Sequence, residues 1–215
     1  MLAGCATQPQ LTKIEAFPKV YQERPLSILV LPPMNESTAA EAKEYYNTTI
    51  AEPLSFDGYY IFPLEVVSDI LKNEGLYDSE TLLNVPPQKF KEYFGADAVL
   101  YIKILKWDTA YYVIGGNVTV SISFLLKSTT TGDDLWKREG TMVLNTSGST
   151  GNVGGVPGLV ALVLTTAIKT AMADYVPVAK LANRVAITAL PCGKYNPKCG
   201  LDQKDLVFQI GNIKQ

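Results

Sequence analysis

The sequence predicts an α/β protein: a three-layer sandwich with a mixed β-sheet, followed by a long apolar helix near the carboxyl end. In the first half of the chain, short apolar runs alternate with segments of helical periodicity, whereas residues 118–126 alternate between apolar and polar side chains. Strands that alternate with helices favour parallel pairing, and half-buried strands in succession favour antiparallel pairing. The 215 residues suit one sizeable domain, which we place at 25–215.

The first half predicts strands and helices in turn. A continuous apolar run at 26–33, ended by two prolines, is typical of a buried strand. Thr38 and Glu41 have the spacing of a capping box, so we expect a helix from there to about residue 54. The next elements are a strand at 58–63, a helix at 64–75 that Gly75 ends, a helix from Pro86 to Gly95, and a strand at 96–107.

The second half predicts a β-hairpin and a loop. The alternating residues 118–126 form one strand, TTTGDD at 129–134 turns the chain, and residues 134–144 return as the partner strand. The glycine-rich segment 146–158 lacks the spacing of a phosphate-binding loop and of a dinucleotide-binding turn. We therefore expect a mobile loop there, without a nucleotide.

The helix predicted at 158–182 is apolar nearly all round in its first half, although a surface helix needs only one apolar stripe. A membrane span needs about 20 largely apolar residues, but Lys169 follows Gly158 by only 11 residues. We expect one face of this helix to pack on its own sheet and the other to meet a second copy in a homodimer. The residues expected at that interface are Leu159, Leu162, Val163 and Leu164.

The amino-terminal stretch MLAGCATQ resembles the end of a bacterial lipoprotein signal, or lipobox. In that interpretation Cys5 carries a diacylglycerol in the outer membrane, and Met1 stands where the signal was cut away. The alternative is a chance leader with an ordinary cysteine. Residues 1–24 would be the lipobox remnant and a flexible tether, or part of the tether would pack on the domain through Ile14, Phe17 and Val20.

Cys192 and Cys199 lie in PCGKYNPKCG, where Pro, Gly and Asn favour a tight turn that brings the two thiols together. A disulfide there would contribute about 2.5 kcal/mol. A zinc site is excluded, since four ligands are needed and the chain has three cysteines and no histidine. Two free cysteines in a reducing compartment are the alternative. A disulfide and a lipobox would both place the protein in the bacterial periplasm.

The composition also excludes several classes of function. The chain has no histidine, so catalytic sites of the Ser-His-Asp and Cys-His kinds and histidine-metal sites are excluded. The net charge is −2 and no basic stretch stands out, so we expect no nucleic-acid partner. We find no catalytic residues and no motif for a cofactor or a metal.

The loop after the first predicted strand is the place where an α/β sheet would bind a small ligand. There, Asn35, Glu36 and Ser37 offer hydrogen-bonding groups to a ligand or a partner, so a periplasmic ligand-binding or enzymatic domain is the alternative function. The same residues would also turn the chain toward the next helix, and we favour this structural role.

Several motifs together resemble a family of bacterial lipoproteins of unknown function: LPPMNES, GYYIFPLEVVSDILKNEGLYD, FGADAVLYIKI and STTTGDDLW. Some of them are also similar to motifs of the TolB amino-terminal domain and of curli-secretion channel lipoproteins. The resemblance implies a TolB-like domain without enzymatic activity, anchored through Cys5 in the outer membrane and facing the periplasm. It further implies partners among other envelope lipoproteins or transport components. Ala6 fits the outer membrane, because inner-membrane retention favours Asp at that position.

Overall fold

The computed structural model describes residues 10–76, 78–112, 115–145 and 176–207. Its strands are β1 (Ser27–Val30), β2 (Met34–Asn35), β3 (Tyr60–Ile61), β4 (Ala98–Tyr112), β5 (Gly115–Ser128) and β6 (Asp134–Asn145). Its helices are α1 (Lys13–Ala16), α2 (Pro18–Glu23), α3 (Ala42–Phe56), α4 (Leu64–Asn73), α5 (Pro87–Phe94) and α6 (Val176–Ile187). Two 3-10 turns, η1 (Thr81–Asn84) and η2 (Asp202–Lys204), complete the described elements.

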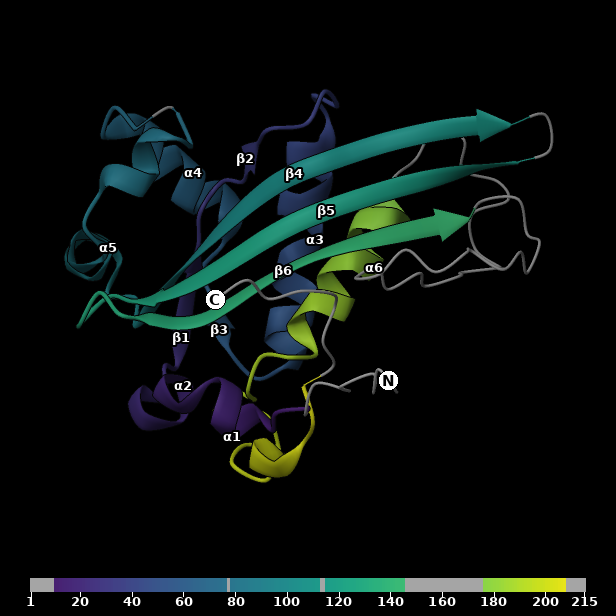
Figure 1. Ribbon diagram of the computed structural model, residues 1–215. Coiled ribbons are helices and arrows are strands. Elements are labelled where there is room, and N and C mark those ends of the chain that lie inside the picture. Colours follow the sequence, from purple (N-terminus) through teal and green to yellow (C-terminus); the bar gives the residue numbers. More distant parts are fainter. Residues whose placement is uncertain (1–9, 77, 113–114, 146–175, 208–215) are drawn as a thin grey trace, which may run out of the picture.

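The strands form one mixed sheet in the order β3-β1-β4-β5-β6, with β2 also paired to β4. β3, β1, β2 and β4 pair in parallel, whereas β4, β5 and β6 form an antiparallel meander. Figure 1 shows that the three meander strands are the long strands of the sheet. The predicted mixed sheet is therefore confirmed, and its two pairing modes follow the two halves of the sequence.

Helices cover both faces of the parallel part of the sheet. On one face, Ile28, Val30 and Leu100 pack with Tyr46 and Ile50 of α3 in a core that also includes α2 and α6. On the other face, the core is smaller and lies under α4, η1 and α5; its members include Leu29, Val99, Val67, Leu82 and Phe90. Successive strand residues alternate between these cores because strand side chains point to opposite faces.

The helix expected from Thr38 begins later, at Ala42. The amide of Asn35 donates to the carbonyl of Ala39 at 2.7 Å, and the hydroxyl of Ser37 accepts from the Ala39 N–H at 3.3 Å. These bonds hold residues 35–39 in a turn, so the helix starts only after it. Most of the other predicted elements are present with shifted ends.

The amino-terminal segment is not a free tether as far as residue 24. α1 and α2 lie on the domain, and Phe17 and Val20 are buried in its larger core. The ring of Phe17 meets that of Trp136 edge to face, with centroids 6.4 Å apart. Packing through these side chains was the alternative to a tether, and burial of two large apolar groups explains it. Cys5 lies outside the described residues.

The long apolar helix expected at 158–182 is not supported. The described part of it belongs to α6, which has 12 residues and runs from Val176 to Ile187. The remainder, with the expected interface residues Leu159, Leu162, Val163 and Leu164, lies outside the described residues, as does the glycine-rich segment. Within the described ranges, none of the helices has the length and apolar character needed to cross a membrane.

Candidate functional site

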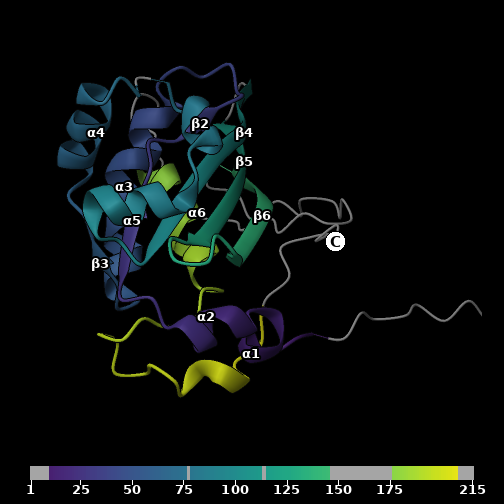
Figure 2. The same cartoon turned by 90° about the vertical axis from the view of Figure 1, so that its left-hand side faces the viewer.

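The two ends of the described chain meet beneath the sheet and form the candidate site. Figure 2 shows α1 and α2 at the lower end of the molecule, together with the yellow segment that follows α6 and includes η2, which we call the carboxyl-terminal segment. The N–H of Val207 donates to the carbonyl of Leu11 at 2.9 Å, and the backbone N–H of Lys13 donates to the backbone carbonyl of Asp205 at 2.8 Å. These bonds join α1 to the segment around η2.

A buried ion pair fixes this junction. The ammonium of Lys13 donates to the carbonyl of Leu190 at 2.8 Å and lies 3.5 Å from the carboxylate of Asp202. The N–H of Cys192 donates to the same carboxylate at 2.8 Å. Burial would raise the pKa of Asp202, but the bonds from Cys192 and the charge of Lys13 outweigh it and hold that pKa below its usual value.

Asp57, at the end of α3, is another acidic group in this region. Burial, together with the negative charge of Asp202, raises its pKa to about 7, and the nearby charge of Lys13 opposes the shift. Its buried Oδ2 atom has no hydrogen-bond partner among the described residues. Its backbone carbonyl accepts from the N–H of Gly193 at 2.8 Å, so α3 is tied to the cysteine-containing segment.

A pocket of about 440 Å³ opens between α2, the start of β3 and the carboxyl-terminal segment. Its lining includes Tyr21, Arg24, Tyr59, Cys192, Lys194 and Cys199. The hydroxyl of Tyr59 donates to the carbonyl of Pro191 at 2.6 Å and closes one wall. A Cβ atom on Gly193 would lie 2.3 Å from the carbonyl oxygen of Gly58, so only glycine allows the two backbones to approach here.

The structure places both cysteines at this pocket, Cys192 half-buried and Cys199 exposed, and holds both as free thiols. The expected disulfide is thus not formed in it, and the pairing stays a prediction. Burial, the hydrogen bond with Asp202 and the neighbouring carboxylates raise the pKa of Cys192 to about 12. A thiol that stays protonated at neutral pH is a poor nucleophile, so Cys192 is not activated for covalent catalysis.

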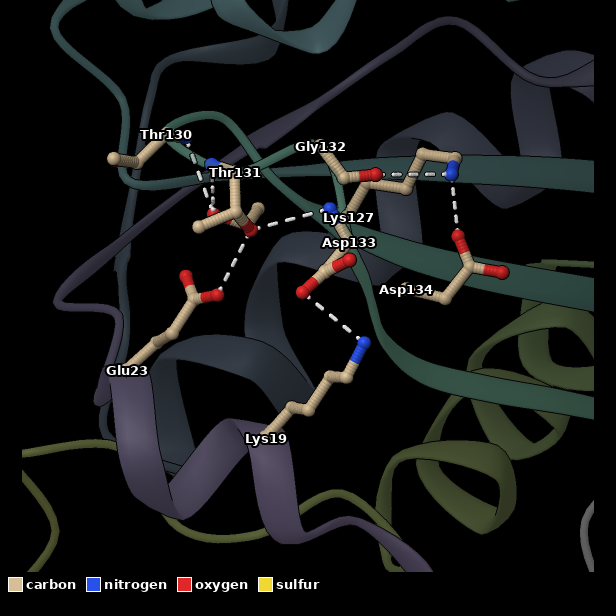
Figure 3. A network of polar contacts seen from close by, with 9 residues as sticks. Lys19, Glu23, Lys127, Thr130, Thr131, Gly132, Asp133 and Asp134 are labelled. Carbon is tan, nitrogen blue, oxygen red and sulfur yellow. Dashed lines mark hydrogen bonds and ion pairs between the residues drawn. The ribbon is translucent and has the colours of Figure 1, made fainter.

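A second set of polar contacts ties α2 to the β5–β6 turn (Figure 3). Glu23 accepts from the hydroxyl of Thr131 at 3.0 Å, and the ammonium of Lys19 lies 3.1 Å from the carboxylate of Asp133. Within the turn, Lys127 donates to the carbonyl of Gly132 at 3.3 Å and pairs with Asp134. The TTTGDD motif therefore has a structural role, because its side chains bind α2 to the β5–β6 turn.

The GAD motif before β4 has a structural role as well. Oδ2 of Asp97 accepts from the N–H groups of Leu26 and Ser27, at 3.1 and 3.2 Å, and so fixes the start of β1. The hydroxyl of Thr129 donates to the carbonyl of Ala96. The motifs at 95–97 and 129–134 thus hold β1, β4 and the β5–β6 turn together.

The loop after β1 is occupied by contacts within the chain. The carboxamide oxygen of Asn35 accepts from the N–H and the hydroxyl of Ser37, at 3.0 and 2.6 Å. Glu36 forms an ion pair with Lys103 at 2.9 Å. These contacts favour the structural role over the ligand site, because the polar groups already have partners.

Sequence reasoning missed the Lys13, Asp57 and Asp202 cluster, since its members are separated by up to 189 positions along the chain. The apolar spacing of Phe17 and Val20 was the one signal that pointed to this junction. Among the described residues, no group of three or more acidic residues or cysteines could hold a metal ion.

The described residues form a mixed α/β fold with helices on both faces of one sheet, and comparison with known proteins places the chain in a family of lipoproteins. Residues 16–193 match the family described as "Putative lipoprotein GNA1162-like", and the chain belongs to this family. It is similar to "Putative lipoprotein NMB1124/NMB1162" of Neisseria meningitidis serogroup B, with 34% identity over 164 residues, 76% of this chain and 75% of that protein. The resemblance inferred from the motifs is thereby confirmed.

A solved structure agrees with this assignment. The crystal structure of lipoprotein GNA1162 from Neisseria meningitidis matches with a TM-score of 0.54 at 35% identity, over 59% of this chain and 88% of that chain. The PelC dodecamer from Paraburkholderia phytofirmans gives a TM-score of 0.48 at 14% identity, over 77% of this chain and 89% of that chain.

Proposed function

We propose that this protein is an outer-membrane lipoprotein, lipidated at Cys5 and facing the periplasm. It acts as a non-catalytic component of an envelope transport, secretion or assembly complex. The observation that carries the proposal is its membership of a lipoprotein family, together with a cysteine in the sequence LAGC at positions 2–5. A diacylglycerol on that cysteine would hold the domain at a membrane surface, where its partners are other envelope proteins.

The chemistry of the pocket supports a docking role over catalysis. The thiol of Cys192 in the pocket is held in its protonated form, and Lys13, which is outside the pocket lining, is engaged by Leu190 and Asp202. A catalytic site would need a group whose pKa is tuned toward its reaction and placed to reach a substrate. Asp57 has a shifted pKa, but it lies outside this pocket and lines a separate, more open one next to Arg184.

The disulfide between Cys192 and Cys199 is part of this proposal, since the periplasm is oxidising. Two successive turns support it: the N–H of Asn196 donates to Gly193 at 3.0 Å, and that of Cys199 donates to Asn196 at 2.9 Å. The chain therefore folds back between the cysteines, and both side chains line the same pocket.

Affinity purification tests the docking role. A carboxyl-terminally tagged protein, expressed from its natural gene, is captured from envelopes solubilised in a mild detergent. We expect envelope proteins to be recovered in a fixed ratio to the bait, and Cys5→Ser to lose them because it no longer reaches the membrane. Recovery of the bait alone, from envelopes in which it is abundant, would contradict the proposal.

A further inference from the structure

Four large apolar side chains are exposed at the end of the molecule where the two ends of the described chain meet. Leu11, Tyr195, Leu201 and Leu206 retain 44%, 66%, 78% and 50% of their accessible surface. The two segments that carry Leu11 and Leu206 are joined, because Thr12 and Leu206 form an antiparallel bridge. We call these four residues the basal surface. The segments that carry them, around α1 and η2, lie at the lower end of the molecule in Figure 2.

Lysines accompany these apolar groups. Lys194, Lys198 and Lys204 are exposed in the same carboxyl-terminal segment. Of the two aspartates there, Asp205 is exposed, whereas Asp202 is buried beside Lys13. Three exposed positive charges against one negative charge make this segment basic, in a chain whose net charge is −2. Leucine, tyrosine and lysine together are the composition of protein surfaces that lie in a lipid interface.

The position of the amino-terminal chain brings this surface to a bilayer. The carbonyl of Leu11 accepts a hydrogen bond from the N–H of Val207. The next residue, Thr12, is the N-cap of α1, and Lys13 in α1 forms the ion pair with Asp202. Leu11 follows Cys5 by six positions, and six residues reach at most about 22 Å when fully extended. A lipid on Cys5 would therefore keep the basal surface within about the thickness of one bilayer leaflet and its headgroups.

We infer that the basal surface rests on the anionic phospholipid surface of the membrane and fixes the orientation of the domain. This inference rests on the anchoring proposed above. Leu11, Tyr195, Leu201 and Leu206 enter the headgroup region, and the three lysines pair with lipid phosphates. Because α1 is pinned to the segment around η2, the contact turns the opposite end of the sheet, with the loop after β2, toward the periplasm.

Vesicle binding by protein without lipid tests this contact separately from lipidation. The full chain carrying Cys5→Ser is sedimented with vesicles of phosphatidylethanolamine and phosphatidylglycerol at a ratio of 7:3. We expect weak binding that falls severalfold between 50 and 300 mM salt. Leu201→Ser combined with Tyr195→Ser should lower the partition coefficient roughly tenfold, since the apolar area entering the interface is lost.

Leu83→Ser is the matched control, because Leu83 is similarly exposed but lies on η1, over the other core. It should leave vesicle binding unchanged, and circular dichroism should show that all variants are folded. Binding that is absent in the Cys5→Ser protein, or lowered equally by Leu83→Ser, would overturn the inference. So would a dimer in the absence of vesicles that Leu201→Ser separates, since the surface would then join two copies. Failure of acylation at Cys5 would overturn the anchoring but would leave this vesicle result readable.

Discussion

Replacement of Asp57 by Asn should change how the stability of the protein depends on pH. Burial raises the pKa of Asp57 to about 7 in the folded protein, whereas an unfolded chain ionises an aspartate near about 3.9. Between these values the folded state holds a proton that the unfolded state has released. The free energy of unfolding therefore falls as the pH rises through this window, and the cost of ionising Asp57 is complete only above its folded-state pKa.

The two pKa values set the size of the effect. The linkage relation gives a loss of about 2–3 kcal/mol between pH 5 and pH 8 from this group alone. Asparagine has nearly the same shape and no charge, so Asp57→Asn should remove the loss. The absence of histidine from the chain makes the measurement clear, because few other side chains titrate in this range.

Urea unfolding followed by circular dichroism at pH 5, 6, 7 and 8 measures the difference between the two proteins. The variant should gain stability relative to the wild type as the pH rises, by about 2–3 kcal/mol in the free energy of unfolding at pH 8 compared with pH 5. Asp69→Asn is the control. The carboxylate of Asp69 on α4 is exposed, and its ion pair with the ammonium of Lys72 is long, at 4.0 Å. Parallel stability profiles for wild type and Asp57→Asn would refute the reasoning.

Three further predictions concern the junction, the cysteines and the subunits. Lys13→Met should lower the free energy of unfolding in urea by roughly 3 kcal/mol, because it leaves the buried carboxylate of Asp202 without its ion-pair partner. Lys19→Met breaks a half-exposed pair and should lower it by less than about 1 kcal/mol. Non-reducing peptide mapping of protein made in the periplasm should show Cys192 joined to Cys199, and free thiols at both positions would reject the bridge. Sedimentation equilibrium at tens of micromolar should give a dimer that Leu162→Glu converts to folded monomer; a wild-type monomer would contradict the homodimer.

The strands and helices with strong periodicity were predictable from the sequence. The alternation at 118–126 lies within β5, and the apolar stripe at 64–75 became α4, since each pattern can bury its apolar face in only one way. β2 was not predicted, because a strand of two residues has no period. The start of α3 was misplaced, since hydrogen bonds from Asn35 and Ser37 take up the residues before it.

The candidate site was predictable only in part. The Cys192 to Cys199 turn could be identified from its prolines and glycines, whereas the loop at Asn35 proved to be engaged within its own chain. The ion pair between Lys13 and Asp202 could not be predicted from the sequence, because it depends on how the two ends of the domain fold together. Interactions of this range are set by tertiary structure and do not appear in local spacing.

Acylation of Cys5 tests the central claim most directly. The protein is expressed from its natural gene in cells grown with labelled palmitate, next to Cys5→Ser and to Cys199→Ser as a matched cysteine control. We predict that the wild type and Cys199→Ser incorporate the label and partition into detergent, and that Cys5→Ser does neither. Absence of label in the wild type, or label that persists in Cys5→Ser, would contradict the assignment of this chain as a lipid-anchored envelope protein.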